Sequence, residues 1–481
     1  MHFSIKATRL GLRKSVTRLP FKYGIACLTW CPQAVLAVTI EVAGRKQTGY
    51  SGDCLPPLWF DKSPGKTFER QIDDMLTVIR LSEESFQEVA ASPVEFFPAW
   101  LMAYEKVRDS AAALGFTNLL SSFGVSMVER AIMDALARAA GLSFASAVRQ
   151  NLYAIEPAKV HPELAGLVPA DWLPTEPKRS LYIRHTIGLG DPLTVAEISG
   201  DERLEDGFPQ AMEEYVQQSG IRYIKVKLAN RPDDDRDRLV AIASILERHL
   251  GADYNLTLDG NELYKTADDF GQLVEVLRST TELENLWKNT LVVEQPLSRE
   301  ISFNVEYLDA IRKLAAHKPV IIDEADGALD SYAKALELGY RGVSSKNCKG
   351  PVKSLLNAGL TWLRNDRGRS SRYVMTGEDL CSVGIVPVQA DLCLVATLGL
   401  EHVERNGHHY HPGLSYLPKS QQEAALAAHG DLYGHRHGRV VPTVRAGRFE
   451  INSLQCTGFG FAVEPEMDSM QSPDEWRRGA K

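Results

Sequence analysis

Apolar runs that end in a charged side chain recur down the second half of this 481-residue chain. Counting from Lys227, the next such ends follow after 32, 35, 29 and 23 residues, at Asp259, Glu294, Asp323 and Lys346. One strand-plus-helix unit needs roughly 30 residues. In a closed barrel of such units, consecutive strand ends lie side by side around one mouth. These five side chains are therefore expected to converge there.

Strand-like and helical patterns alternate from about residue 180 onward. The helix expected after the run 223–227 has Asp233 as its predicted N-cap and repeats apolar residues at helical spacing from Leu239 to Leu250. Alternation of this kind implies a parallel sheet, and this many units imply closure into a (β/α)8-type barrel. The expected strands include 223–227, 255–259, 291–294, 319–323, 342–346, 373–376 and 401–405.

The remainder of the chain has a different character. Residues 1–150 begin with β-branched runs and continue with helical periods that end near Gly141, a plausible C-cap, which predicts an α+β unit. A proline-dense stretch at 151–180 reads as a connector. The barrel is expected over 181–437. The segment 438–481 carries short β-like runs that we expect to add strands to the N-terminal sheet.

Composition restricts the class of protein. A hydrophobic content of 44% with 24% charged residues is ordinary for a globular protein. The net charge of −8 and the lack of a basic stripe argue against nucleic-acid binding. No apolar stretch reaches the roughly 18 residues that a membrane helix needs. Seven scattered cysteines with no CxxC pair indicate reduced thiols, so a cytoplasmic location is expected.

The three acids predict a cation site. An acid after a strand is often only a turn former or the N-cap of the next helix. Three in successive units, with lysines before and after, are poorly explained in that way. Carboxylates of Asp259, Glu294 and Asp323 facing one cavity would repel one another unless a cation lay among them, and hard oxygen ligands suit Mg²⁺, with Mn²⁺ as an alternative.

The lysines predict proton transfer. Strand alternation points Lys225 and Lys227 to the same face, and two neighbouring ammonium groups are expected to lower each other's pKa. A lysine with a lowered pKa is a usable base. Lys346, four units round the barrel from Lys227, would approach the cavity from the opposite side. One base on each face of a planar intermediate would allow a proton to be removed from either face and returned to either.

The strings IKVKL, LDGNE, VVEQPL, IIDEAD and SSKNCKG resemble the successive strand ends of the enolase superfamily, in its muconate lactonizing enzyme-like and mandelate racemase-like members. The resemblance implies a modified TIM barrel with an α+β capping domain at residues 1–150, completed by the C-terminal segment. It implies that Mg²⁺ is held by Asp259, Glu294 and Asp323. It implies that Lys227 and Lys346 are the acid/base pair, with Lys225 as an electrostatic neighbour.

Further residues have weaker roles in the same resemblance. Asn261 and Glu324 follow ligands in the family's pattern and are expected to support them or to touch substrate. Glu378 and Asp379 follow the seventh strand, where the family often places polar residues. His185, on the expected first strand, is a candidate for specificity, with a satisfied core histidine as the alternative.

The reaction and substrate stay open at this stage. The sequence at 375–378 lacks the histidine of a mandelate racemase-type site, and the paired aspartates of dipeptide epimerases are missing after the eighth strand. Racemisation or epimerisation of a small carboxylate is the first choice, followed by cycloisomerisation. Dehydration of an acid sugar and a non-catalytic binding barrel are the alternatives. A homo-oligomer is compatible with any of these.

Two other features are noted. The segments 18–24 and 54–59 lie where family members close loops over the substrate, although both could be ordinary turns. Several histidines cluster late in the chain without the i, i+4 helical spacing of a zinc site, which favours a surface or substrate-proximal loop. They are His402, His408, His409, His411, His435 and His437.

Overall fold

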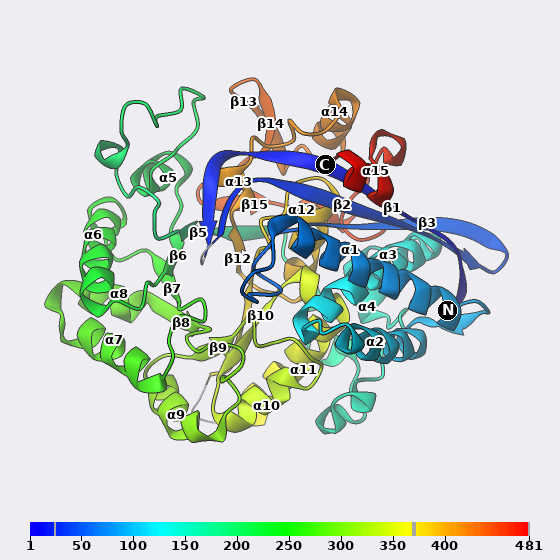
Figure 1. Cartoon of the computed structure of the whole chain (residues 1–481), viewed down its shortest axis with the longest axis horizontal. Coiled ribbons are helices and arrows are strands. Elements are labelled where there is room, and N and C mark those ends of the chain that lie inside the picture. Colours follow the sequence, from blue (N-terminus) through cyan, green and yellow to red (C-terminus); the bar gives the residue numbers. More distant parts are fainter. Residues whose placement is uncertain (24–25, 368–371, 480–481) are drawn as a thin grey trace.

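The fold was analysed in a computed structural model, which describes residues 1–23, 26–367 and 372–479. A parallel eight-stranded sheet closes on itself, because its last strand pairs with its first. The expected (β/α)8-type barrel is thus confirmed (Figure 1). Its strands are β5 (Ser180–Ile187), β6 (Tyr223–Lys227), β7 (Asn255–Asp259), β8 (Thr290–Glu294), β9 (Val320–Ile322), β10 (Gly342–Ser345), β11 (Val374–Gly377) and β12 (His402–Arg405).

Helices surround this barrel and join consecutive strands. They are α5 (Met212–Ser219), α6 (Pro232–Leu250), α7 (Ala267–Ser279), α8 (Glu284–Asn289), α9 (Leu308–His317), α10 (Ser331–Leu338), α11 (Pro351–Arg367) and α12 (Val386–Thr397). Among the described residues, none of the helices is both long enough and apolar enough to span a bilayer.

Helix α6 shows how the sequence sets an element's ends. Pro232 occupies its first turn, where a missing N–H costs nothing, and Asp233 lies inside that turn. The N-cap is Arg231, so the prediction of Asp233 as the cap is wrong. The cause is local: the carboxylate of Asp235 accepts from the backbone N–H of Ala229 and of Arg231 and fixes the entry to the helix.

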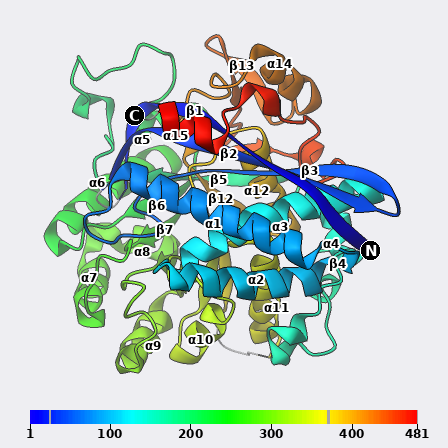
Figure 2. The ribbon, with the colours of Figure 1, turned by 45° about the vertical axis from the view of Figure 1, so that its right-hand side comes forward.

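The N-terminal part forms an antiparallel sheet with helices along one face (Figures 1 and 2). Gly49 of the sheet permits the close approach of α3, since a Cβ there would lie 2.2 Å from the carbonyl oxygen of Ala131. Gly141 ends α3 in the left-handed region, as expected. The elements are β1 (His2–Tyr23), β2 (Ala26–Val42), β3 (Arg45–Cys54), β4 (Val94–Glu95), α1 (Phe68–Val89), α2 (Phe96–Ala113), α3 (Asn118–Ala140) and α4 (Phe144–Arg149).

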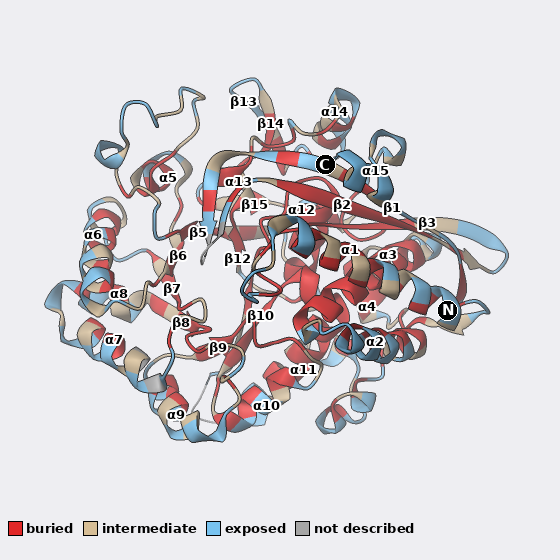
Figure 3. Ribbon diagram, viewed as in Figure 1, coloured by how far each residue is buried: buried red, intermediate tan, exposed pale blue. Residues whose placement is uncertain are grey.

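The proline-rich stretch carries three short 3-10 turns and no strand or α-helix within 157–171. Buried residues are concentrated in the barrel strands and where the N-terminal sheet faces its helices (Figure 3). The four-part division of the chain at 150, 180 and 437 stays a proposal.

The C-terminal segment returns to the N-terminal part by another route than expected. Strand β15 (Arg448–Glu450) pairs with barrel strand β5, so the prediction that this run joins the N-terminal sheet is wrong. An isolated bridge between Leu12 and Gln471 and the contacts of α15 (Pro473–Gly479) with β1 make the return instead. The remaining elements are α13 (Gly407–Tyr410), α14 (Lys419–Ala428), β13 (Tyr433–Arg436) and β14 (Arg439–Pro442).

Candidate active site

The mouth of the barrel is brought together by strand register. Lys227 is paired with Asp259 across β6 and β7, and Asp259 with Glu294 across β7 and β8. Asp323 follows directly after the last residue of β9, and Lys346 after that of β10. Parallel strands in register end at the same edge, so the side chains predicted to converge do come from one rim.

A cavity of about 370 Å³ lies at this rim. One wall is apolar and comes from the N-terminal part, with Phe21, Leu58 and Trp59. The two segments expected to close over a substrate therefore both reach the cavity, although Gly24 lies outside the described residues. The N-terminal part also contributes Lys62. The charged lining on the barrel side consists of Lys225, Lys227, Glu262, Glu300, Asp323, Glu324, Lys346, Asp379 and Glu404.

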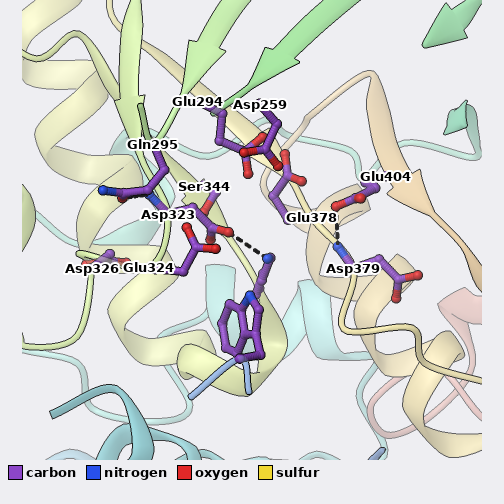
Figure 4. A network of polar contacts seen from close by, with 12 residues as sticks. Asp259, Glu294, Gln295, Asp323, Glu324, Asp326, Ser344, Glu378, Asp379 and Glu404 are labelled. Atoms are coloured by element: carbon purple, nitrogen blue, oxygen red, sulfur yellow. Dashed lines mark hydrogen bonds and ion pairs between the residues drawn. The ribbon is translucent and has the colours of Figure 1, made fainter. Parts of the chain in front are cut away.

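Lys225 is the centre of a buried charge cluster. Its ammonium lies 2.8 Å from Glu294 Oε1, 2.7 Å from Glu378 Oε2, 3.0 Å from Asp259 Oδ2 and 3.2 Å from Glu404 Oε2. Figure 4 shows the carboxylates of Asp259, Glu294 and Glu378 facing one another, with Asp323 and Glu404 on either side. Four acids from four strands thus share one cation.

This cluster corrects one expectation about the lysine pair. Burial by itself would lower the pKa of Lys225, but the four carboxylates, beginning with Asp259 and Glu294, raise that pKa well above its usual value. The prediction that neighbouring lysines would lower the pKa of Lys225 is therefore wrong. Opposite charges at contact distance outweigh one like charge farther along the strand.

The two lysines predicted as acid/base groups each pair with a predicted metal ligand. Lys227 donates to Asp259 Oδ2 at 2.5 Å, and Lys346 donates to Asp323 Oδ2 at 2.7 Å. The ammonium of Lys346 also lies 4.4 Å from the centre of the Trp59 ring, a cation–π contact. Strands β6 and β10 are four strands apart in an eight-stranded barrel, so the two lysines face the cavity from opposite sides.

Asp323 is held more firmly than the other two acids. Its carboxylate accepts from Lys346, from the Ser344 hydroxyl and, at 3.2 Å, from Lys349 Nζ. Burial would raise the pKa of Asp323, but the two lysines lower it well below its usual range. The pKa of Glu294 moves the other way, since burial and the nearby Asp259 and Glu378 carboxylates raise it well above normal.

The other predicted residues have varied surroundings. Asn261 lines the cavity, and its backbone N–H donates to Asp259 Oδ1 at 2.8 Å. Glu324 also lines the cavity, with one buried carboxylate oxygen that has no hydrogen-bond partner among the described residues. Asp379 accepts from the backbone N–H of Ser382 and of Asn406.

His185 and Glu378 lie behind the cavity lining. His185 is buried and its Nδ1 lies 3.1 Å from Nε2 of His408, so it is not in the described wall of the cavity. Glu378 is fully buried between Lys225 and the guanidinium of Arg184, which donates to it. Neither residue is placed to touch a ligand in this arrangement.

Sequence reasoning missed three charged residues of the mouth: Arg184, Lys349 and Glu404. Glu404 lies in β12 and receives hydrogen bonds from Lys225 and from the Thr186 hydroxyl. The sequence did carry a signal for Glu404, because it is an acid next to the end of an expected strand, much as Asp259 is the acid at the end of its strand. No comparable signal marked Arg184 in the middle of β5, because an arginine inside a strand is usually solvent-exposed.

The predicted ligands fit a hard divalent cation by their chemistry. Within the described ranges, no group of three or more His, Cys, Asp or Glu is gathered closely enough to hold a metal ion. Asp259 and Glu294 nevertheless already share one cation, the Lys225 ammonium, and the second oxygen of Glu294 is buried with no partner in the described chain. A metal ion would compete with Lys225 for these oxygens.

Comparisons with known proteins were made for the sequence and for the structure. No protein-family model matches the chain, and no curated protein matches its sequence. Solved structures match over nearly their whole length. A dipeptide epimerase from Enterococcus faecalis, complexed with Mg and the dipeptide L-Leu-L-Tyr, is 14% identical with a TM-score of 0.58, and the match covers 95% of this chain and 99% of that one.

Two further structures match in the same way. An enolase from Bradyrhizobium, complexed with magnesium and mandelic acid, is 15% identical with a TM-score of 0.56 and 96% of both chains covered. A muconate lactonizing enzyme from Pseudomonas fluorescens, complexed with muconolactone, is 15% identical with a TM-score of 0.55, covering 96% of this chain and 98% of that one. The fold of this chain is the one found in enolase-superfamily structures, barrel and N-terminal part together.

Proposed function

We propose, from this shared fold and from the side chains at the barrel mouth, that the protein is an enolase-superfamily enzyme that removes the proton α to a carboxylate and forms an enediolate intermediate. Racemisation or epimerisation is the reaction we favour, with cycloisomerisation next. The observation that carries the proposal is the position of Lys227 and Lys346, which line one cavity from opposite sides of the barrel. Two bases placed in this way suit proton removal on one face and return on either.

The chain's own residues would divide the work as follows. Lys227 would take the α-proton from one face, and Lys346 would give or take it on the other. To act as a base, each lysine must first leave its carboxylate partner, Asp259 or Asp323, and give up a proton, since only the neutral amine can accept one. Lys225, held by the carboxylates of Glu378 and Glu404, supplies positive charge beside the developing negative oxygens.

Mg²⁺ is the cofactor that we propose, with Asp259, Glu294 and Asp323 as the residues that would hold it. When bound, it would supply positive charge that stabilises the enediolate oxygens. A carboxylate engaged with such an ion would also be a weaker partner for Lys227 or Lys346, which favours their release as bases.

The cavity indicates the kind of substrate. Its lysines, together with the proposed Mg²⁺, suit a carboxylate, and its apolar wall of Phe21, Leu58 and Trp59 suits a hydrocarbon or aromatic body. A volume of about 370 Å³ is within the range of small-molecule sites. We therefore propose a small carboxylic acid with an apolar substituent.

One observation favours dehydration as a second candidate. Glu324 lines the cavity, and burial, followed by the nearby Asp323 and Glu262 carboxylates, raises its pKa. A carboxyl group with a raised pKa is protonated more often and could protonate a leaving hydroxyl. Elimination needs such an acid, whereas racemisation needs only the two lysines.

The test is a screen of carboxylic acids in D₂O with Mg²⁺, in which exchange of the α-hydrogen is followed by mass. Exchange reports enediolate formation whatever the final product is. If deuterium uptake is the only change in the mass of the substrate, the result supports racemisation or epimerisation. If the product has also lost water, the result supports dehydration. Tight binding of acids with no exchange in any case would refute the catalytic proposal and support a binding barrel.

A further inference from the structure

A second cavity lies outside the barrel mouth, with a volume of about 120 Å³. Four segments form it: β1 at Arg18, the stretch before and within α5, the α13 turn with the residues after it, and the β13–β14 hairpin with the residues that follow. It shares no lining residue with the main cavity among the described residues.

The lining of this second cavity is basic. Arg18, Arg436, His408, His411 and His437 all contribute to it, and no Asp or Glu does in the described parts of the chain. Asp206, which precedes the lining residue Gly207, is itself outside the lining and already neutralised. Arg18 binds both of its carboxylate oxygens, and Arg439 approaches it at 3.4 Å.

Arg436 supplies a positive charge that nothing in the described chain balances. Its side chain is exposed, and it makes no ion pair or side-chain hydrogen bond there. The guanidinium of Arg18, by contrast, already donates hydrogen bonds to Asp206 and to the backbone carbonyls of Phe208, Pro209 and His409. The cavity thus combines one structural arginine with one that is free to bind.

Two imidazole nitrogens at this cavity are buried without a partner. They are Nε2 of His411 and Nδ1 of His408, neither of which has a hydrogen-bond partner among the described residues. The other nitrogen of each ring is engaged: Nδ1 of His411 lies 3.0 Å from Ser15 Oγ, and Nε2 of His408 lies 3.1 Å from Nδ1 of His185. A buried polar group without a partner is destabilising, which favours an occupant that bonds to it.

His411 lines the cavity, and one of its two tautomers places a hydrogen on the unpartnered Nε2. The Ser15 hydroxyl can donate to Nδ1 of His411, which leaves the hydrogen on Nε2. Burial lowers the pKa of His411 to about 4, so the ring is neutral near pH 7 and donates without carrying a charge. The site would therefore offer an N–H donor from one side and a guanidinium from the other.

We propose that this cavity is a binding site for a small oxyanion, the carboxylate or phosphate group of a small molecule, separate from the catalytic cavity. Arg436 would supply the charge and His411 a directed hydrogen bond. Charge-assisted hydrogen bonds from a guanidinium to such groups are the strongest that a protein commonly makes. A ligand bearing a positive charge is disfavoured, because no described lining side chain carries a negative charge.

The experiment is calorimetric titration of the full-length protein with inorganic phosphate and, separately, with acetate, at constant ionic strength and neutral pH. We expect at least one of them to bind, and which one decides between the two groups. Arg436→Gln should weaken this binding roughly tenfold. Arg45→Gln is the matched control, since Arg45 is also exposed and unpaired but lies on β3. It should change the affinity less than about twofold.

Lys227→Ala changes only the catalytic cavity, so it distinguishes anion binding there from anion binding at the second cavity. Binding of the anion at the second cavity should be intact in this variant. A histidine-selective ¹⁵N spectrum gives an independent readout, in which anion addition should shift the Nε2 resonance of His411, assigned with His411→Gln. The proposal is overturned if neither anion binds, which would mean a hydrated cavity. It is also overturned if Arg45→Gln weakens binding as much as Arg436→Gln, or if Lys227→Ala abolishes it while Arg436→Gln does not.

Discussion

The barrel mouth has two halves that use charge differently. In the first half, from β6 to β10, Lys227 and Lys346 line the cavity and pair with the acids predicted to hold a cation. In the second half, formed by β11, β12 and β5, Glu378 and Arg184 are fully buried and pair with each other. We call these the motif half and the closing half.

The comparison teaches where catalysis and where stability reside. Ion pairs of the motif half reach the cavity, so a substrate or cation can exchange for one partner. The Arg184–Glu378 pair of the closing half has no exposed surface, and Glu378 and Glu404 both hold the Lys225 ammonium, although Glu404 also lines the cavity. Burying one charge of such a set without its partners is costly. Substitutions in the two halves should therefore affect different measurements.

The largest effect is expected from the lysines of the motif half. Lys227→Ala and Lys346→Ala should each lower the rate of α-hydrogen exchange on the true substrate by about 10³-fold, because each removes an acid/base group. Mg²⁺ binding should be largely kept. The rate is measured by deuterium incorporation. Exchange at the wild-type rate in either variant would refute the two-base mechanism. It would also mean that the motif half is not the catalytic half of the barrel mouth.

The next effect is on stability, in the closing half. Glu378→Ala leaves Arg184 and Lys225 with one carboxylate fewer in a buried site, so the free energy of unfolding should fall by about 3–5 kcal/mol. Urea denaturation measures it. Glu378→Gln keeps the shape and serves as control, with a smaller loss expected. A Glu378→Ala protein within about 1 kcal/mol of wild type would show that this cluster is not a stabilising unit.

Mg²⁺ binding should also distinguish the motif half from the closing half, with a smaller effect on stability. Mg²⁺ at about 100 times its dissociation constant should stabilise the folded protein by about 2.7 kcal/mol, seen as a higher thermal midpoint that EDTA reverses. Glu294→Gln should remove most of this shift, because it takes away a proposed ligand. Glu404→Gln, in the closing half, should retain it. Equal shifts in both variants would mean that the ion binds elsewhere.

The smallest predicted effect is the loss of stability at acid pH that is caused by protonation of His185 on β5. Burial lowers the pKa of His185 to about 3, whereas the unfolded value is about 6.5. The unfolded chain thus binds the proton first, so the contribution of this group to stability is complete above about pH 6.5 and declines as the pH falls toward 3. At pH 5 the loss should be about 2 kcal/mol.

His185→Gln should flatten this part of the stability profile, measured by urea denaturation between neutral pH and pH 5. A histidine on the surface, His435, provides the control as His435→Gln, which should leave the profile unchanged. If the profiles of wild type and His185→Gln run parallel, His185 does not titrate as a buried group.

Much of the barrel was predictable from local patterns. The strands 223–227 and 255–259 were placed with their observed bounds, because apolar alternation and turn residues mark both ends. The cap of α6 was not, since a carboxylate one turn inside the helix fixes its entry. The run at 448–451 has a β pattern in any context, and only packing decided that its strand would join β5. Site roles at the mouth remain proposals.

The sequence by itself determined the order of strands and the charged residue at each strand end, because periodicity and position in a strand are local properties. It therefore also determined that Lys227, Asp259, Glu294, Asp323 and Lys346 would share a rim. Only the tertiary structure decided which charges pair. Glu378 and Glu404 meet Lys225, and Arg184 meets Glu378, because the barrel closes between β12 and β5. The electrostatic balance depends on distances across the barrel that no stretch of sequence encodes.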